Sequence, residues 1–310
     1  MKTINRCLTA LFLLLFAAVS FAQEKPKIKV LILTGQNNHN WRLSTPALKE
    51  LLEQSGRFTV DVASSPTKAD KQKDQGTYYK ALAEFKPDFA KYDVIVSDYN
   101  SCETGDDWSA DTQKSFEDYM KNGGGFVSYH AADNSFPRWG EFNKVIGIAG
   151  WGRPANFGNF TYYKDGKQVI EKGHDRCGSH GPQHDFLMVV RDEEHPITKG
   201  LPKEFMHGQD ELYDSMQGPA ENLSIKATAL SEKQFNGTEK DEPMLMTIQY
   251  GKGRVFHTTL GHVMNEGDLK KLRDVSFIAT FLRGTEWAAT GAVTIPLPPD
   301  FPGRDKPVYR

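Results

Sequence analysis

The first half of the chain alternates short apolar segments with stretches that have the periodicity of an amphipathic helix. The apolar segments have the length and composition of buried strands, and they occupy residues 27–34, 58–63, 92–98 and 126–129. Helical patterns follow the first and the third of these, at residues 44–56 and 110–121. Strands that alternate with helices form a parallel sheet through right-handed crossovers. The sequence therefore predicts an α/β fold, with helices on both sides of a parallel sheet.

Two segments depart from this alternation. Residues 64–89 are polar and rich in Lys, and we expect a loop with a short helix there. Residues 147–186 are rich in Gly, Trp, Tyr and His and show no regular periodicity. Irregular segments of this length in a compact domain are usually functional or mobile. We therefore interpret the second segment as a long insertion rich in His, Gly and aromatic residues.

Strand patterns return in the second half of the chain, at residues 186–191, 224–230, 244–250 and 254–259. The Gly-Lys-Gly sequence at 251–253 predicts a tight hairpin turn between the last two strands. A closing helix is expected over residues 269–282, followed by an irregular Pro-rich tail, about 296–310, that packs on the fold or hangs free. Because no repeat or linker interrupts residues 23–310, we expect them to form a single domain.

The first 22 residues have the features of a secretory signal peptide. Lys2 and Arg6 precede an apolar run that ends at Phe21, and Ser20 and Ala22 supply small residues before a cleavage point. The run is too short, and wrongly flanked, for a membrane-spanning helix. We therefore expect cleavage after Ala22 and a mature protein that is periplasmic or secreted, with no membrane span.

Composition limits the partners of the mature chain. The formal net charge is -2, which does not favour a nucleic acid or an anionic membrane as the partner. Cleavage would leave Cys102 and Cys177. In an oxidising compartment these form one disulfide or remain separate thiols, and the sequence leaves both alternatives open, together with the oligomeric state.

Histidines follow three of the predicted strands. Open parallel sheets bind ligands beyond the carboxyl ends of their strands. His39 follows the first strand, His130 the fourth and His262 the last. A single loop histidine is more often structural than functional, but three at one edge of a sheet favour a common pocket. We therefore expect His39, His130 and His262 to lie close together.

A second group of polar residues lies in and after the insertion. His180 and His184 have the spacing of a metal-binding pair on a helix, but Gly181 and Pro182 between them disfavour a helix and exclude the metalloprotease pattern. They remain our candidates for a divalent ion, zinc or manganese. The segment HGQDELY then supplies three polar candidates, His207, Asp210 and Glu211. In an extended segment Asp210 and Glu211 point to opposite faces, so only one enters a given pocket.

Common catalytic motifs are missing from the sequence. Ser128 lacks the glycines of a nucleophile elbow, and His130 stands where such a nucleophile would be expected. No G-x-G-x-x-G sequence and no P-loop follows any predicted strand, so a nucleotide cofactor is not indicated.

Several longer segments resemble one known family. They are LTGQNNHNW, YDVIVSDYN, GGGFVSYHAAD, HGPQHDF, RDEEHPITKGLP, HGQDELY, GKGRVFHTTLGH and RGTEWAATG. In this order they resemble the ThuA-like (trehalose utilisation) family, especially its exported subgroup. The resemblance implies a flavodoxin-like sheet of the class I glutamine amidotransferase type without the catalytic Cys, and a role in the use of glucosides or their 3-keto derivatives. It also implies a pocket made from nine residues: His39, His130, Asp133, His180, His184, His207, Asp210, Glu211 and His262.

The leading functional hypothesis is an enzyme that acts on a carbohydrate by general acid–base chemistry. His130 is the expected base, oriented by Asp133 or by one of Asp210 and Glu211. Isomerisation, epimerisation or elimination of a keto-sugar would follow from one such base. A hydrolase with two carboxylates at a fixed separation is less favoured, because no isolated acid pair stands out. The alternatives are a non-catalytic sugar-binding protein and a metal-dependent hydrolase.

Other residues are expected to hold the sugar. The candidates are His39, His207 and His262, together with Trp41, Trp139 and Trp151, whose indole rings would stack on the sugar ring. For each Trp, packing in the core is the alternative.

Overall fold

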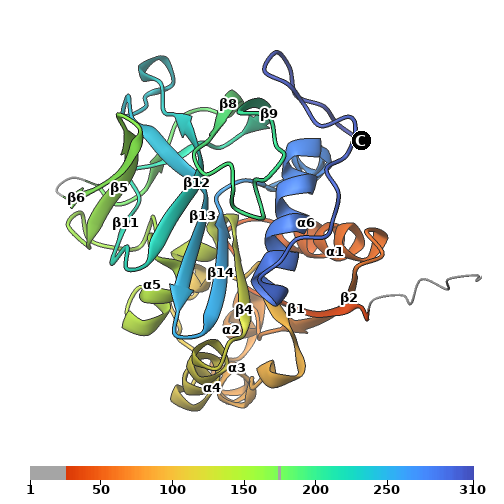
Figure 1. The fold of residues 1–310 in the computed structure, drawn as a ribbon. Coiled ribbons are helices and arrows are strands. Elements are labelled where there is room, and N and C mark those ends of the chain that lie inside the picture. The colour runs from red at the N-terminus through yellow and green to blue at the C-terminus, as the bar shows by residue number, and fades with distance from the viewer. Residues whose placement is uncertain (1–25, 174–175) are drawn as a thin grey trace, which may run out of the picture.

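The computed structural model describes residues 26–173 and 176–310. The expected signal peptide, residues 1–22, lies outside them. The described chain forms a large mixed sheet with helices on both faces (Figure 1). None of the described helices has both the length and the apolar character needed to cross a bilayer.

Five parallel strands form one half of the sheet. In spatial order they are β2 (Phe58–Ser64), β1 (Ile28–Thr34), β3 (Val94–Ser97), β4 (Gly125–Tyr129) and β14 (Gly253–Thr258). All four neighbouring pairs are parallel. This is the 2-1-3-4-5 order of flavodoxin-like folds, in which the chain crosses to the other side of β1 after β2. The predicted fold class is thus confirmed.

Antiparallel strands extend the sheet beyond β14. They are β13 (Asp241–Tyr250), β12 (Leu223–Leu230), β8 (His184–Val190) and β9 (Glu204–Asp210). The predicted hairpin is confirmed, since β13 and β14 pair from Leu245–Thr258 to Tyr250–Gly253. Two short strands, β7 (Ser179–His180) and β10 (Tyr213–Asp214), pair separately.

The segment 147–186 is more regular than the sequence indicates. It contains the hairpin of β5 (Asn159–Lys164) and β6 (Lys167–Lys172), which joins the large sheet through β13 and β11 (Gln217–Gly218). The hairpin escapes prediction because β6, KQVIEK, is mostly exposed or half-buried and has no apolar face.

Helices cover both faces of the sheet. One face carries α1 (Trp41–Gln54) and α6 (Val275–Thr290). The other carries α3 (Gln75–Glu84), α4 (Ala110–Lys121) and α5 (Gly140–Ile146). The remaining helices are α2 (Lys68–Lys73) and the 3₁₀ helices η1 (Phe89–Lys91), η2 (Ser101–Glu103), η3 (His130–Asn134), η4 (Lys233–Phe235) and η5 (Glu266–Arg273).

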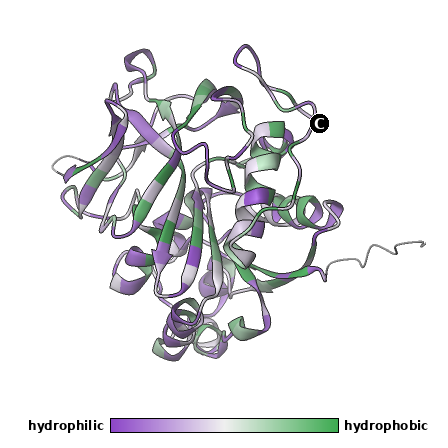
Figure 2. Cartoon of the chain, viewed as in Figure 1, coloured by the Kyte–Doolittle hydropathy of each residue, from purple (hydrophilic) through white to green (hydrophobic). Residues whose placement is uncertain are grey.

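Alternating residues of the central strands supply both halves of the core. Val30 and Ile32 of β1 pack in the cluster that includes α1 and α6, whereas Leu31 and Leu33 pack in the cluster that includes α3 and α4. The colouring in Figure 2 shows the apolar centre of the sheet between helices with polar outer sides. The two-residue period of a strand therefore places apolar side chains on both faces of a buried sheet.

Three expectations for the helices are wrong in detail. Helix α1, expected from residue 44, begins at Trp41, so that Ser44 lies inside it and donates its hydroxyl to Asp98 at 2.7 Å. The closing helix, expected at 269–282, divides at Asp274 into η5 and α6, because the Asp274 side chain caps α6. The polar segment 64–89 contains two helices, α2 and α3, each with a capping side chain at its start.

The tail from Pro296 packs on the fold, which was one of the two alternatives. The amide of Met206 on β9 donates to the carbonyl of Gly303 at 2.8 Å, and Phe301 packs against Phe205. The amide of Val275, the first residue of α6, donates to the carbonyl of Val308 at 2.8 Å.

Helix α6 lies against β14 at a glycine. A Cβ at Gly284 would overlap the ring of Phe256, which is buried on β14. We therefore expect Gly284→Ala to lower the free energy of unfolding by about 1–3 kcal/mol, although alanine is the better helix former. Chemical denaturation measures the change. Gly76→Ala in α3, where the nearest atom is 3.4 Å from the new methyl group, is the control and should alter stability by less than about 0.5 kcal/mol. Equal stability of the Gly284 variant and the wild type would contradict the packing argument.

Candidate functional site

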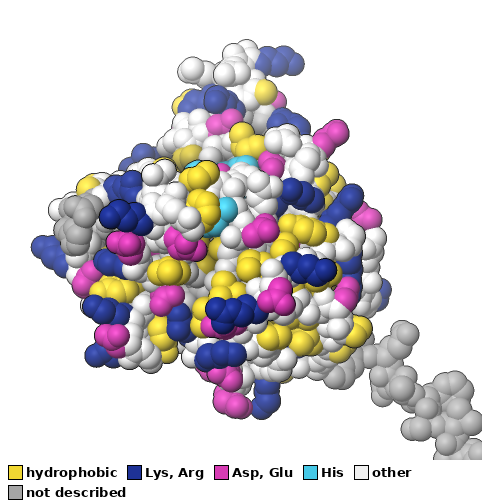
Figure 3. All heavy atoms as spheres, turned by 90° about the horizontal axis from the view of Figure 1, so that it is seen from above, with side chains coloured by type: hydrophobic (Ala, Val, Ile, Leu, Met, Phe, Trp, Pro, Cys, Tyr) yellow, Lys and Arg dark blue, Asp and Glu magenta, His cyan; other side chains and the backbone are white. Residues whose placement is uncertain are grey.

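Three histidines meet beyond the carboxyl ends of the parallel strands. His39 lies in the loop after β1, His130 directly follows β4, and His262 lies in the loop after β14. The ring centroid of His39 lies 4.7 Å from that of His130 and 4.8 Å from that of His262. The rings of His130 and His262 are 5.5 Å apart. Figure 3 looks onto this side of the molecule and shows histidine side chains at the surface. The structure thus brings together the three residues that the sequence places at strand ends.

The backbone and one ring nitrogen of His130 are tightly constrained. Its φ of 45° is uncommon for a residue other than glycine. Its Nδ1 lies 2.6 Å from the carbonyl oxygen of Thr259, which can only accept, so Nδ1 carries the proton. Nε2 then presents a lone pair, which accepts the hydroxyl of Tyr213 at 3.0 Å.

Glu211 supplies the carboxylate of the cluster. Its Oε1 lies 3.2 Å from Nε2 of His262 and 3.8 Å from Nε2 of His180. Its Oε2 lies 3.8 Å from Nε2 of His130. The Glu211 side chain is buried, and among the described residues no Lys or Arg forms an ion pair with it. We call His39, His130, Glu211 and His262 the histidine cluster.

The neighbouring Asp210 holds the backbone of the cluster rather than entering it. This buried carboxylate accepts the amides of Gly261 at 2.6 Å, His262 at 3.1 Å and Glu211 at 2.8 Å. It therefore fixes the loop after β14 to the end of β9, and Glu211 is the acid that faces the histidines.

Burial sets the charge of the cluster. It lowers the pKa of His39 to about 3, with His262 and His180 adding to the effect, and it lowers the pKa of His130 well below its usual value. Burial also lowers the pKa of His262 and raises that of Glu211 to about 7. The imidazoles of the cluster are accordingly neutral near pH 7 and offer lone pairs rather than positive charge.

His207 lies beneath the cluster and carries charge. Its Nε2 is 3.0 Å from Asp210, and its Nδ1 is 2.9 Å from the hydroxyl of Ser276 and 3.5 Å from Asp274. Burial opposes the charge on this ring, but Asp274 and Asp210 outweigh it and raise the pKa of His207 to about 9. His207 is buried, so in this structure it supports Asp210 rather than facing the cluster.

Aromatic rings lie on one side of the cluster. The ring of Tyr213 is 4.8 Å from that of His130, and Trp151 meets Tyr213 edge-on at 4.7 Å. His180 stacks on Tyr213 at 6.1 Å and lies 5.7 Å from Trp151. Trp151 and the exposed His180 thus form the outer rim of the cluster.

Two of the three Trp candidates have other partners. Trp139 is in the core, stacked on Phe142 at 5.4 Å. Trp41 starts α1, its amide donates to the carbonyl of His39 at 3.0 Å, and the guanidinium of Arg42 lies 4.2 Å from its ring.

Two polar candidates also have other partners. His184 stacks on Phe235 at 3.6 Å, and the carboxylate of Asp133 lies 3.3 Å from Nε2 of His257. Asp133 therefore pairs with His257 instead of orienting His130, and His184 does not face Glu211 as His180 does.

Tyr213 and Gln183 join the site without having been predicted. Tyr213 stands two residues after Glu211, in the same motif, and this spacing could have placed it on the same side of the chain. The amide nitrogen of Gln183 lies 3.0 Å from Nδ1 of His262. Only the folded chain brings Gln183 to this ring, from 79 positions away. Cys102 and Cys177 are both free thiols.

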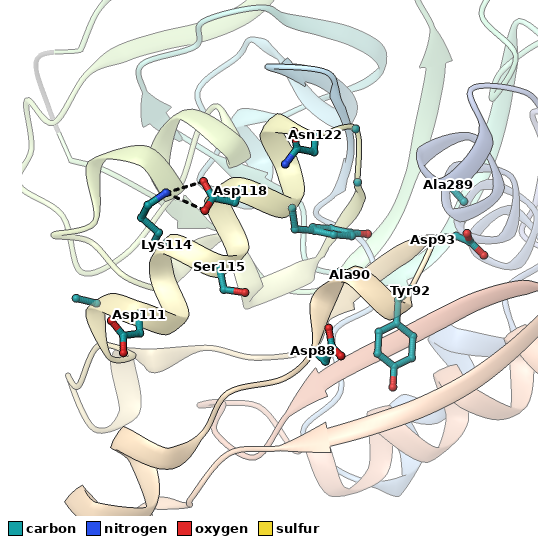
Figure 4. A pocket seen from close by; sticks show the side chains of 14 residues that line it. Asp88, Ala90, Tyr92, Asp93, Asp111, Lys114, Ser115, Asp118, Asn122 and Ala289 are labelled. Carbon is teal, nitrogen blue, oxygen red and sulfur yellow. Dashed lines mark hydrogen bonds and ion pairs between the residues drawn. The ribbon is translucent and has the colours of Figure 1, made fainter.

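A large cavity at the other end of the sheet lacks this chemistry. Its volume is about 960 Å³, and it lies beside the amino ends of β3 and β4. Figure 4 shows its acidic side chains, among them Asp88 and Asp111, and the ion pair between Lys114 and Asp118. No histidine lines it, and we therefore assign the candidate site to the histidine cluster.

Comparisons with known proteins agree with the fold. A sequence model of the ThuA family, described as trehalose utilisation, matches residues 29–288. A ThuA-like protein of known structure from Parabacteroides merdae ATCC 43184 is 44% identical, with a TM-score of 0.84, over 92% of this chain and 98% of that one. A ThuA-like protein from Bacteroides uniformis ATCC 8492 is 21% identical, with a TM-score of 0.54, over 87% and 96% of the two chains, and supports the fold alone. No curated protein matches the sequence. The chain belongs to the ThuA family, whose description is trehalose utilisation.

Proposed function

We propose that the protein is an exported enzyme that processes a glucoside, a disaccharide or its 3-keto derivative by proton transfer at the histidine cluster. One observation carries the proposal. Glu211 and His262, from two distant segments, meet at 3.2 Å within a group of imidazoles, and the aromatic rings of Tyr213 and Trp151 lie beside them. Carboxylates and imidazoles are the common proton carriers of enzymes, and aromatic rings suit the apolar face of a sugar.

A keto-sugar suits this arrangement chemically. A carbonyl group makes the adjacent C–H bond acidic, and a carboxylate such as Glu211 can take that proton to leave an enolate. His262, whose Nε2 lies 3.2 Å from Oε1 of Glu211, would orient the carboxylate for the transfer. Return of the proton to the other face of the same carbon gives an epimer, and its return to the neighbouring position gives an isomer. Loss of the glycosidic substituent from the enolate gives an elimination.

Incubation with defined sugars tests the proposal. Trehalose, a second glucoside and their 3-keto forms are incubated with the protein in D₂O, with and without divalent metal, and analysed by mass spectrometry and NMR. We expect deuterium at a carbon next to the carbonyl of the keto form, together with a rearranged or cleaved product. His262→Gln should slow this exchange by about 100-fold.

His195→Gln is the matched control, because His195 packs against Trp287 at 4.9 Å, outside the histidine cluster. Its exchange rate should equal that of the wild type. Micromolar binding of a sugar without exchange or product would instead identify a non-catalytic sugar-binding protein. Unchanged sugars under every condition would contradict the enzyme.

A further inference from the structure

Three members of the histidine cluster have the spacing of metal ligands. His39, His130 and Glu211 each offer one ligand atom, and these atoms all lie within 4.8 Å of one another. Around a tetrahedral zinc with ligand distances near 2.1 Å, neighbouring ligand atoms are about 3.4 Å apart. The separation of 3.8 Å between His130 and Glu211 is already near this value. Small rotations of the three side chains would bring their ligand atoms from within 4.8 Å of one another to this spacing.

Hydrogen bonds orient both imidazoles with a lone pair toward the cluster. Nδ1 of His130 donates to the carbonyl of Thr259. Nδ1 of His39 lies 3.3 Å from the Oδ1 of Asn37, and the same oxygen accepts the amide of His39 at 3.0 Å. An oxygen that accepts the amide also accepts the ring proton, which leaves Nε2 of His39 with its lone pair. Metal-binding histidines are usually held in this way by an oxygen on the other ring nitrogen.

His262 has the opposite arrangement and lies outside the ligand set. The amide nitrogen of Gln183 is a donor and lies 3.0 Å from Nδ1 of His262, so that nitrogen accepts. The proton is then on Nε2, which donates to Oε1 of Glu211 at 3.2 Å. His262 therefore orients the carboxylate, and leaves Oε2, the oxygen nearer to His130, for a cation.

The backbone conformation of His130 helps to fix the direction of its ring. Its φ of 45° places a bulky residue in the left-handed region, a strain that proteins usually retain at binding and catalytic sites. The hydrogen bond to the carbonyl of Thr259 holds the ring, with Nε2 3.8 Å from Oε2 of Glu211.

We propose that His39, His130 and Glu211 bind one divalent transition-metal ion, of the kind of zinc or manganese. Two histidines and one glutamate form a ligand set that leaves a coordination position open for water or a substrate oxygen. The ion replaces the hydroxyl of Tyr213 at Nε2 of His130. This site differs from the His180 and His184 pair that the sequence favours, because His184 stacks on Phe235. The metal site does not depend on the proposed function, since it concerns the protein without a sugar.

Metal uptake by the full mature chain tests the site. The protein is stripped with a chelator, dialysed against Zn²⁺ or Mn²⁺, and studied by elemental analysis and calorimetry. We expect one ion per chain, and an affinity that falls by more than about 100-fold in His39→Gln and in Glu211→Gln, because each loses a direct ligand and loss of a group that only orients a ligand costs about 10–100-fold. The bound ion should also raise the melting temperature of the wild type.

Two further variants make the result specific. His184→Gln should bind the ion like the wild type. His262→Gln should still bind one ion per chain, with an affinity reduced by about 10–100-fold, as for other groups that orient a ligand.

Circular dichroism shows whether each variant is folded. Wild-type uptake below one ion per chain would overturn the site, and so would an unchanged affinity in folded His39→Gln and Glu211→Gln. A loss of binding confined to His184→Gln would also overturn it. Because no sugar is present, failure of metal uptake leaves the proposed turnover untouched, and unchanged sugars in the D₂O experiment would leave the metal site untouched.

Discussion

Asp210→Ala is expected to lower the free energy of unfolding by about 3–5 kcal/mol, which is the usual effect of removing one member of a buried charged pair. Asp210 is fully buried. It accepts the amides of Glu211, Gly261 and His262 and contacts the ring of His207. Alanine would leave three buried amides without a partner and a buried imidazolium with one acid fewer. Each unsatisfied amide alone costs about 1–3 kcal/mol.

Urea denaturation followed by circular dichroism measures this loss. Asp185→Ala is the control, because Asp185 is an exposed acid on the neighbouring strand β8, and its removal should change the stability by less than about 0.5 kcal/mol. If the Asp210 variant lost no more stability than the Asp185 variant, Asp210 would not be the group that joins the loop after β14 to β9.

The parallel half of the fold is predictable from local sequence. The strands β1 and β4 are almost wholly buried and appear as short, mostly apolar runs, and α4 has an apolar stripe and a capping Ser109. Strand β9 was not predicted, because its sequence, EFMHGQD, is largely polar. Its polar residues are buried by contacts with Asp274, Gly261 and His262, which come from segments far along the chain.

The sequence predicts those site residues that follow a parallel strand. His39, His130 and His262 could be placed together because each follows a parallel strand, and parallel strands end at one edge. The choice between Asp210 and Glu211 required the position of β9. The partner of Asp133 could not be found either, since His257 lies 124 positions away on β14. The sequence gives no means to distinguish Trp139 from Trp151. Only the packing in the folded chain shows that Trp139 lies in the core and that Trp151 lies beside Tyr213.

The buried charge on His207 predicts that stability declines in alkaline solution. An imidazole has a pKa of about 6.5 in an unfolded chain, whereas Asp274 and Asp210 outweigh burial and raise the pKa of His207 to about 9 in the folded protein. The folded state therefore holds this proton more tightly. The resulting stability is fully present below about pH 6.5 and is lost as the pH rises to about 9. A difference of about 2.5 pKa units corresponds to roughly 3 kcal/mol.

Comparison of the wild type with His207→Gln isolates this contribution from those of other groups. Urea denaturation at about pH 6, 7.5 and 9 should show the stability difference between the two proteins falling by roughly 3 kcal/mol across the range. In His195, burial lowers the pKa to about 4, so the difference between the wild type and His195→Gln should stay constant above about pH 7.5. A constant difference for His207→Gln as well would mean that His207 is neutral in the folded protein. Asp210 and Asp274 would then both lie against the buried ring of His207 without a cation between them.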